Sequence, residues 1–237
     1  MWDVWGRDIT LSERDVGYIE LGPGERVRAP GPCSVVVRMT GSNGSSPFVV
    51  APGTELDAGP DGGALGVVAW EGPAPRGDAR IESTAPRYFG KYDSFQAQVT
   101  IQDESGDWIA PWEIYHVRMV ADRQETVQLH VHHRVTNLLF VPGPIGEERG
   151  YLLVERDGVV TATPLVGGDR AIVRPNILHH VVPIRSGDPT EMIVFNNDRS
   201  SYENVEQGDF HIVKTIPWAE VAVQARDDPR PRLTVIE

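Results

Sequence analysis

The stretch LHVHHRVTN, residues 129–137, contains three of the seven histidines of this 237-residue chain. If residues 126–132 form a strand, side chains two positions apart lie on the same face, with roughly 6.6 Å of backbone between them. His130 and His132 then point the same way and can converge on one ion, whereas His133 faces the other side. A third ligand would have to come from elsewhere in the fold.

The segments around this stretch are short, and many are separated by turn residues. The chain has 24 glycines and 19 prolines, which are scattered and not arranged in a repeat. Strand-like segments occur at 17–21, 34–38, 48–50, 64–70, 114–120, 126–132, 138–141, 151–154, 159–163, 171–173, 180–184 and 192–195. No window shows helical periodicity beyond about two turns. This pattern predicts an all-β protein, either a sandwich or a barrel.

The polar, turn-rich segment DESGDWIAP, residues 103–111, marks a candidate domain boundary. We therefore expect a β-rich N-terminal half at 1–112 and a barrel with a C-terminal extension at 113–237. One continuous double barrel also fits the pattern.

Charge and composition exclude several classes of function. The net charge of −12 and the presence of only two lysines, Lys91 and Lys214, argue against general affinity for nucleic acid. No apolar run is long enough for a membrane helix. Cys33 is the single cysteine, so neither an intrachain disulfide nor a cysteine-based zinc cluster can form. The first residues, MWDVWGRDIT, lack the pattern of a signal peptide, and we expect a cytoplasmic protein.

A second histidine pair closes the segment GGDRAIVRPNILHH, residues 167–180, in which two tight turns flank a short strand. Together with the first pair, this segment resembles the cupin superfamily. In the register of that family's second motif, Gly168-Asp169 and Pro175-Asn176 form the turns and His179 is the ligand. In the first motif His130 and His132 match, but Asn137 stands where the family has a glutamate.

The resemblance implies a cupin-type double-stranded β-helix, which is a jelly-roll barrel, with a divalent transition metal held by His130, His132 and His179. Fe(II) is the metal we expect first, and Zn, Ni or Mn are alternatives. Asn137 is neutral and a weaker ligand than a carboxylate. The longer segment 142–150 could bring Glu147 or Glu148 to the barrel mouth.

The first half contains a fainter match to the second motif. FVVAPGTEL, residues 48–56, repeats the strand and the turn, but Leu56 stands where the histidine would be. Either the chain is a bicupin with a degenerate first barrel, or this segment is an ordinary turn. Three pieces also resemble homogentisate dioxygenases, namely VVAWEG at 67–72, KYDSF at 91–95 and VADRQETVQLHVHHR at 120–134. Glu71 stands where that family has a histidine that acts on the substrate.

Three neutral imidazoles on a divalent ion leave open coordination positions and a positive centre, which suits a small chelating anion. We therefore expect a metal-dependent cupin enzyme, specifically a non-haem iron dioxygenase acting on a small aromatic or enolisable acid. A redox-neutral isomerase or cyclase and a non-catalytic small-molecule-binding cupin are the alternatives. By resemblance, the protein is expected to be a homodimer.

Several other residues are candidates for supporting roles. In WEIYHVRMV, residues 112–120, Tyr115, His116 and Arg118 are candidate catalytic residues or hydrogen-bonded structural ones. Arg134 and Arg174 could hold an anionic substrate or form surface salt bridges. His133 and His180 are expected to be packing or surface residues, and His211 has no assigned role.

Overall fold

The computed structural model of the protein describes residues 16–29, 34–39, 47–50, 53–69, 80–83, 87–89, 94–102, 104–106, 113–119, 126–183, 190–197 and 210–237. Over this part of the chain nearly all regular structure is strand, together with one short 3₁₀ helix, η3 (Trp218–Glu220). The expectation of an all-β protein is confirmed. Among these residues no helix has the length and apolar character needed to cross a membrane.

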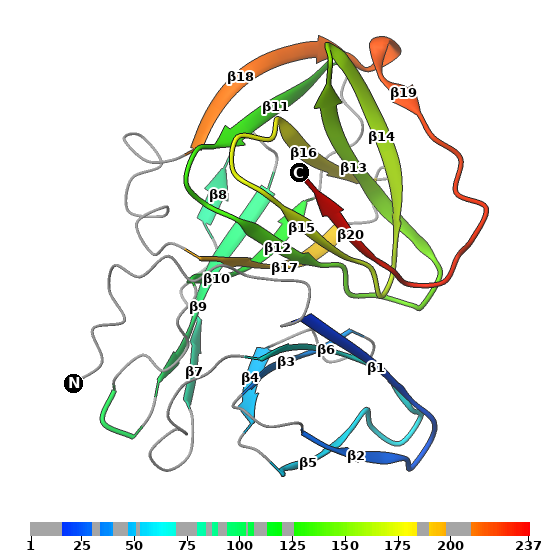
Figure 1. The fold of residues 1–237 in the computed structure, drawn as a ribbon. Helices are drawn as coiled ribbons and strands as arrows, with labels where there is room; N and C mark the ends of the chain where they lie inside the picture. The colour runs from blue at the N-terminus through cyan, green and yellow to red at the C-terminus, as the bar shows by residue number, and fades with distance from the viewer. Residues whose placement is uncertain are drawn as a thin grey trace.

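The larger of two facing sheets has eight strands in the order β20-β15-β12-β17-β10-β9-β7, with β8 paired to β9 (Figure 1). Its strands are β7 (Arg80–Ser83), β8 (Arg87–Phe89), β9 (Ser94–Gln102), β10 (Glu113–Met119), β12 (Asn137–Phe140), β15 (Arg170–Val173), β17 (Thr190–Asn196) and β20 (Leu233–Ile236).

The smaller sheet has six strands in the order β18-β11-β16-β13-β14-β19. Its strands are β11 (Thr126–His132), β13 (Glu148–Arg156), β14 (Val159–Val166), β16 (His179–Pro183), β18 (Phe210–Pro217) and β19 (Ala222–Val223).

From β10 to β18 the chain passes repeatedly between these two sheets. Strands β10, β12, β15 and β17 belong to the larger sheet, whereas β11, β13, β14, β16 and β18 belong to the smaller one. Since a strand buries one face against the opposite sheet, alternate residues fill the space between the sheets. Leu139 and Val194 of the larger sheet form one buried cluster with Leu152, Val154 and Val181 of the smaller sheet. This alternation produces a jelly-roll barrel with an apolar interior.

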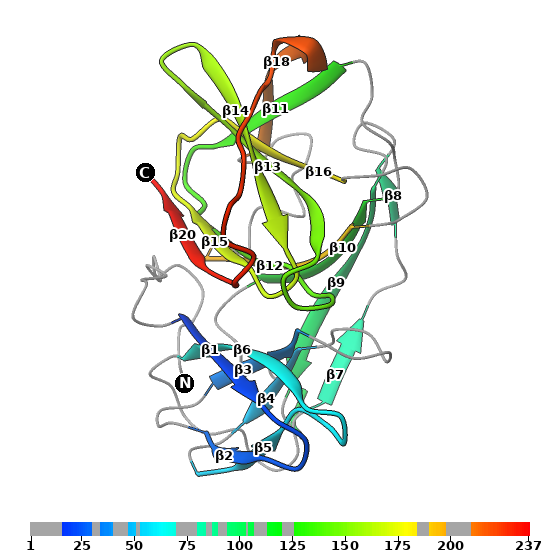
Figure 2. The same ribbon diagram turned by 90° about the vertical axis from the view of Figure 1, so that its right-hand side faces the viewer.

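A third sheet precedes the barrel and covers the outer face of the eight-stranded sheet (Figure 2). Its order is β1-β6-β3-β4, and a separate pair is formed by β2 and β5. Its strands and those of the pair are β1 (Val16–Leu21), β2 (Arg26–Arg28), β3 (Ser34–Arg38), β4 (Pro47–Val50), β5 (Glu55–Asp57) and β6 (Gly63–Ala69).

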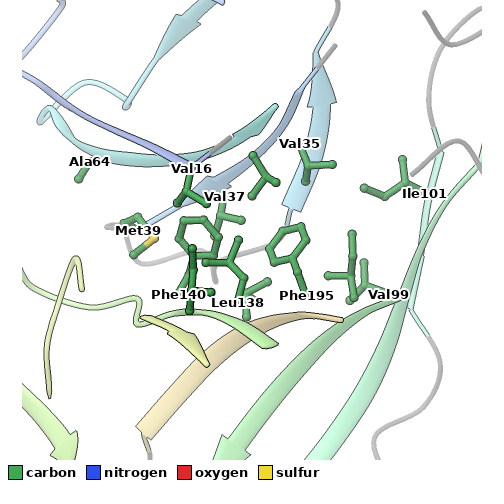
Figure 3. Close-up of a cluster of buried hydrophobic side chains, with 14 residues drawn as sticks. Val16, Val35, Val37, Met39, Ala64, Val99, Ile101, Leu138, Phe140 and Phe195 are labelled. Carbon is green, nitrogen blue, oxygen red and sulfur yellow. The ribbon is translucent and has the colours of Figure 1, made fainter. Parts of the chain in front are cut away.

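The interface between this N-terminal sheet and the barrel is a continuous hydrophobic core. Figure 3 shows Phe140 and Phe195 pointing from the barrel sheet toward Val35 and Val37 of β3. The two phenylalanine rings are 5.5 Å apart in an edge-to-face arrangement. Gly66 makes room for this contact, because a Cβ at that position would lie 2.3 Å from a carbon of the Phe140 ring. This part of the outer face of the eight-stranded sheet is therefore buried, whereas His116 and Arg118 farther along β10 are partly or fully exposed.

The expected division at residue 112 falls between β9 and β10, which pair with each other along residues 94–99 and 114–119. Strands from both sides of the boundary thus share one sheet. Within the described residues β1 to β6 form a four-stranded sheet and a two-stranded pair, whereas β7, β8 and β9 join the eight-stranded sheet. The domain division and the degenerate first barrel remain predictions.

The C-terminal segment is fixed to the turn at Gly168-Asp169. Strand β20 pairs in parallel with β15, and the Arg226 guanidinium forms an ion pair with the Asp169 carboxylate in which both side chains are 2% exposed. The backbone N–H of Arg232 also donates to Asp169 (3.0 Å). One aspartate therefore connects the second motif to the end of the chain.

Candidate metal centre

His130, His132 and His179 come from two adjacent strands of the six-stranded sheet. His130 and His132 lie on the same face of β11, as the spacing of two predicts. His179 is the first residue of β16 and pairs directly with His130. Its neighbour in register on the other side is Val154, a residue of the interior cluster. The face that carries the three histidines is therefore the one that points into the barrel.

The three rings are close enough to share one ion. Their centroids are 5.3 Å apart for His130 and His132, 4.3 Å for His130 and His179, and 5.7 Å for His132 and His179. Each ring has one nitrogen that can serve as a ligand atom, and these three nitrogens all lie within 4.8 Å of one another. Nitrogens bound to one ion at about 2.1 Å are roughly 3 Å apart when they lie at right angles. Small side-chain rotations would bring these rings to that separation, so the residues fit a transition metal ion.

Burial keeps the imidazoles of His130 and His179 in the neutral form that binds metals. It lowers the pKa of His179 to about 4. Burial, followed by the nearby positive charge of His179, His132 and His180 when protonated, lowers the pKa of His130 well below its usual value. His179 donates its Nδ1 hydrogen to the carbonyl oxygen of Ile177 (2.8 Å). The lone pair is then on Nε2, and the ring is held by a backbone contact of the kind that orients metal-binding histidines.

Comparisons with known proteins found matches among solved structures. No family model and no curated protein matches the sequence. Among solved structures, a variant of the oxalate decarboxylase of Bacillus subtilis matches with a TM-score of 0.40 and 11% identity, over 60% of this chain and 34% of that chain. An oxalate oxidase matches with a TM-score of 0.36 and 12% identity, over 48% and 56% of the two chains. The capsular polysaccharide assembling protein CapF of Staphylococcus aureus matches with a TM-score of 0.38 and 9% identity, over 57% and 34%.

This chain therefore spans about a third of the length of two of these proteins and about half of the third. With TM-scores of 0.40 or less and identities of 12% or less, these similarities carry no argument. The assignment rests on the order of strands between the two sheets and on the histidines at β11 and β16. The barrel is of the cupin type. The resemblance predicted from the two sequence motifs is confirmed.

The turn before His179 connects the two motifs of the cupin barrel. Asn176 has a φ of 66°, in the left-handed region that asparagine tolerates better than most residues. Its backbone N–H donates to the carbonyl oxygen of His132 (2.6 Å), and its side-chain oxygen accepts from Nδ1 of His133 (2.8 Å). The Pro-Asn turn thereby holds the end of β11 beside the start of β16.

Asn137, at the position of the usual glutamate, does not join the three histidines. It is 4% exposed and begins β12, on the same face as the interior residue Leu139. Its side-chain nitrogen donates to the side-chain oxygen of Asn196 on β17 (2.5 Å). The group of candidate ligands in the described residues contains no carboxylate and includes neither Glu147 nor Glu148. Both glutamates are exposed near the start of β13.

The candidate catalytic residues of β10 are on different faces. Tyr115 points inward and belongs to the interior cluster. His116 and Arg118 alternate with it on the opposite face, and the Nε2 atom of His116 lies 3.6 Å from a carboxylate oxygen of Glu191. This contact, more than any other, lowers the pKa of Glu191. The structure thus does not bring His116 or Arg118 together with the three histidines, and a catalytic role for any of these residues remains a prediction.

The remaining histidines lie outside the metal group. His180 is buried and next to His179 in β16, so strand alternation directs it to the other face of the sheet. His133 is exposed, and its ring is 5.2 Å from that of the exposed His211. Arg134 is exposed and Arg174 half-buried, at the ends of the two motif strands.

One interior residue was missed by the sequence analysis. Glu113 is 1% exposed, begins β10 and lies two positions before Tyr115, on the same inner face. It pairs in register with Asn196, which in turn pairs with Asn137. Strand alternation in the segment WEIYHVRMV indicates that Glu113 and Tyr115 share a face, but it does not tell which face is the inner one.

Proposed function

We propose that this protein is a metal-dependent cupin enzyme, specifically a non-haem Fe(II) dioxygenase acting on a small aromatic or enolisable acid. The observation that carries the proposal is the group of three histidines whose nitrogens lie within 4.8 Å of one another on the inner face of the barrel. A bound ion would supply a Lewis-acidic, redox-capable centre with open coordination positions.

Charge supports the class of substrate. The three histidines are neutral ligands and do not offset the charge of a divalent ion. The ion would therefore stay positively charged unless another ligand is anionic. The buried side chains of Leu139, Val154 and Val181 make the interior apolar, which strengthens the attraction between such a centre and an anion. A chelating anion such as a catecholate, an enolate or a carboxylate fits these conditions.

The chain's own residues then have separate tasks. The three imidazoles hold the ion, and the hydrogen bond from His179 to the Ile177 carbonyl orients one of them. Tyr115 brings a phenolic group to the interior wall. The apolar cluster excludes water from the bound molecule, which suppresses competing hydrolysis.

Metal analysis tests the proposal. Protein purified without added metal should contain about one equivalent of iron or another transition metal. His132→Ala should lose it, because His132 supplies one of three ligands. His133→Ala is the matched control, since the neighbouring exposed ring is outside the group. Wild-type protein that retains no metal after exposure to Fe(II), Mn(II), Ni(II) and Zn(II) would refute the proposal.

Two alternatives have specific support. A redox-neutral isomerase or cyclase would use the same centre as a Lewis acid with the buried Glu113 as a proton acceptor, and turnover would consume no oxygen. A non-catalytic binding cupin is favoured by Asn137, which is held by Asn196 and offers no carboxylate. In that case ligand affinity would survive complete chelation. A homodimeric state and a cytoplasmic location remain untested predictions.

A further inference from the structure

Glu113 is an acidic side chain in the interior of the barrel to which the dioxygenase proposal assigns no task. Among the described residues the buried carboxylates are Glu113 and Asp169. Asp169 is fully engaged with Arg226 and with backbone N–H groups at the far turn. Glu113 is 1% exposed and on the face of β10 that contributes Tyr115 and Val117 to the interior. Sequestering a carboxylate in this way requires a chemical reason.

Strand register places Glu113 at the end of the barrel that contains the histidines. Glu113, Asn196 and Asn137 form a row across three adjacent strands, β10, β17 and β12. Neighbouring strands are about 4.8 Å apart, so the row extends over roughly 10 Å. Asn137 begins β12, and His132 ends the preceding strand β11 in the facing sheet. The polar row and the histidines thus lie at the same end of the barrel, on opposite walls.

Glu113 does not belong to the group of candidate metal ligands, which consists of His130, His132 and His179. Tyr115 on its own strand and the three histidines of the facing sheet also lie on the inner faces of the two sheets. The histidines are committed to the ion. Glu113 supplies a carboxylate on this inner face, and a carboxylate can act as the proton acceptor for a molecule bound between the two walls.

We propose that Glu113 accepts the proton that an enolic or phenolic substrate loses when it binds the ion as a chelating anion. The inference rests on the proposed metal-dependent function. The O–H bond of the substrate breaks, its electron pair stays on the substrate oxygen, and a new O–H bond forms on the Glu113 carboxylate. No oxidant or reductant takes part. The transfer avoids placing two negative charges in one apolar interior, because the carboxylate becomes neutral as the substrate becomes anionic.

A proton count on binding tests the assignment. The probe is maltol, a hydroxypyranone whose hydroxyl is protonated at pH 7 and which chelates as its anion. Titration calorimetry of the metal-loaded protein in two buffers with different ionisation enthalpies gives the number of protons released to solvent. Wild-type protein should release almost none, and Glu113→Gln should release about one per maltol bound, since the glutamine amide cannot take the proton. Glu148→Gln, an exposed glutamate near the start of β13, is the matched control and should behave as wild type.

Glu113→Met provides a second carboxylate-free side chain of similar length should the glutamine variant fold poorly. Release of one proton by the wild-type protein would overturn the inference, as would unchanged proton release in folded Glu113→Gln or Glu113→Met. Metal content, measured on the same samples, distinguishes failure of the inference about Glu113 from failure of the proposed function. A wild-type protein that binds metal but shows no role for Glu113 refutes the inference alone, whereas a protein that binds no metal refutes the function on which it rests.

Discussion

Replacing Arg226 by methionine should break the contact that holds the C-terminal segment on the barrel. All five N–H donors of a guanidinium can be placed here. Two bind the Asp169 carboxylate, one at 3.0 Å, and the others bind the carbonyl oxygens of Asp228 (2.8 Å), Pro164 (3.1 Å) and Arg230 (2.7 Å). Methionine fills much of the same length but offers no donor.

The expected loss of stability follows from the state of the Asp169 carboxylate in the variant. The Asp169 carboxylate would stay buried, with the backbone N–H groups of Val166 (2.9 Å) and Arg232 (3.0 Å) as its remaining donors. Removing one partner of a buried pair costs about 3–5 kcal/mol of folding free energy, because the other charge is left uncompensated. For a chain of this size that lowers the melting temperature by roughly 10 °C.

Urea unfolding followed by tryptophan fluorescence measures this difference, with Arg230→Met as the matched control. Arg230 also forms an ion pair, with Asp228 at 2.7 Å, but the two side chains are 84% and 52% exposed. Solvent screens such a pair, so its removal should change stability little. If the two variants lose the same free energy of unfolding, the reasoning from burial is wrong.

Three further predictions concern packing, pH and the ligand set. Gly66→Ala should cost about 1–3 kcal/mol through overpacking against the buried Phe140 ring, and urea unfolding should show Gly17→Ala to be much milder, because its Cβ would meet Val67 at an ordinary 3.4 Å. Burial lowers the pKa of His180 to about 4 from 6.5, so the unfolded chain binds more protons between these values and the stability of the metal-free protein should fall as pH drops from 6.5 to 4. His180→Leu should flatten that dependence in denaturant titrations at each pH, and an unchanged slope would exclude His180 as its source. Asn137→Glu should raise metal affinity, measured by competition with a chelator, because it restores the carboxylate of the first motif; weaker binding would show that the pair with Asn196 is required instead.

Much of the barrel could be predicted because its strands follow local rules. The segment 126–132 coincides with β11, and the spacing of two correctly placed His130 and His132 on one face. Most of the other predicted segments end within about two residues of a strand, whereas β9 and β18, two of the longest strands, were not predicted. His179 was harder to place from the sequence, because its approach to His130 depends on the pairing of β11 with β16 over a separation of 49 residues. Only the family resemblance supplied that pairing in advance.

The residues of β10 show where such reasoning fails. Alternation divides Glu113 and Tyr115 from Ile114 and His116, but it does not say which pair points into the barrel. Usually polarity would decide, since one face of an antiparallel strand is commonly solvated. Here the outer face carries Ile114, His116 and Arg118, of which only Ile114 is buried, whereas the inner face carries the buried Glu113 together with Tyr115, Val117 and Met119. Glu113 is the charged exception on the more apolar face, so polarity alone left the directions of Glu113 and His116 ambiguous. The ambiguity is resolved by the cluster that joins Ile114 to Val35 and Val37 of the covering sheet, a contact between segments about 80 residues apart that no local pattern encodes.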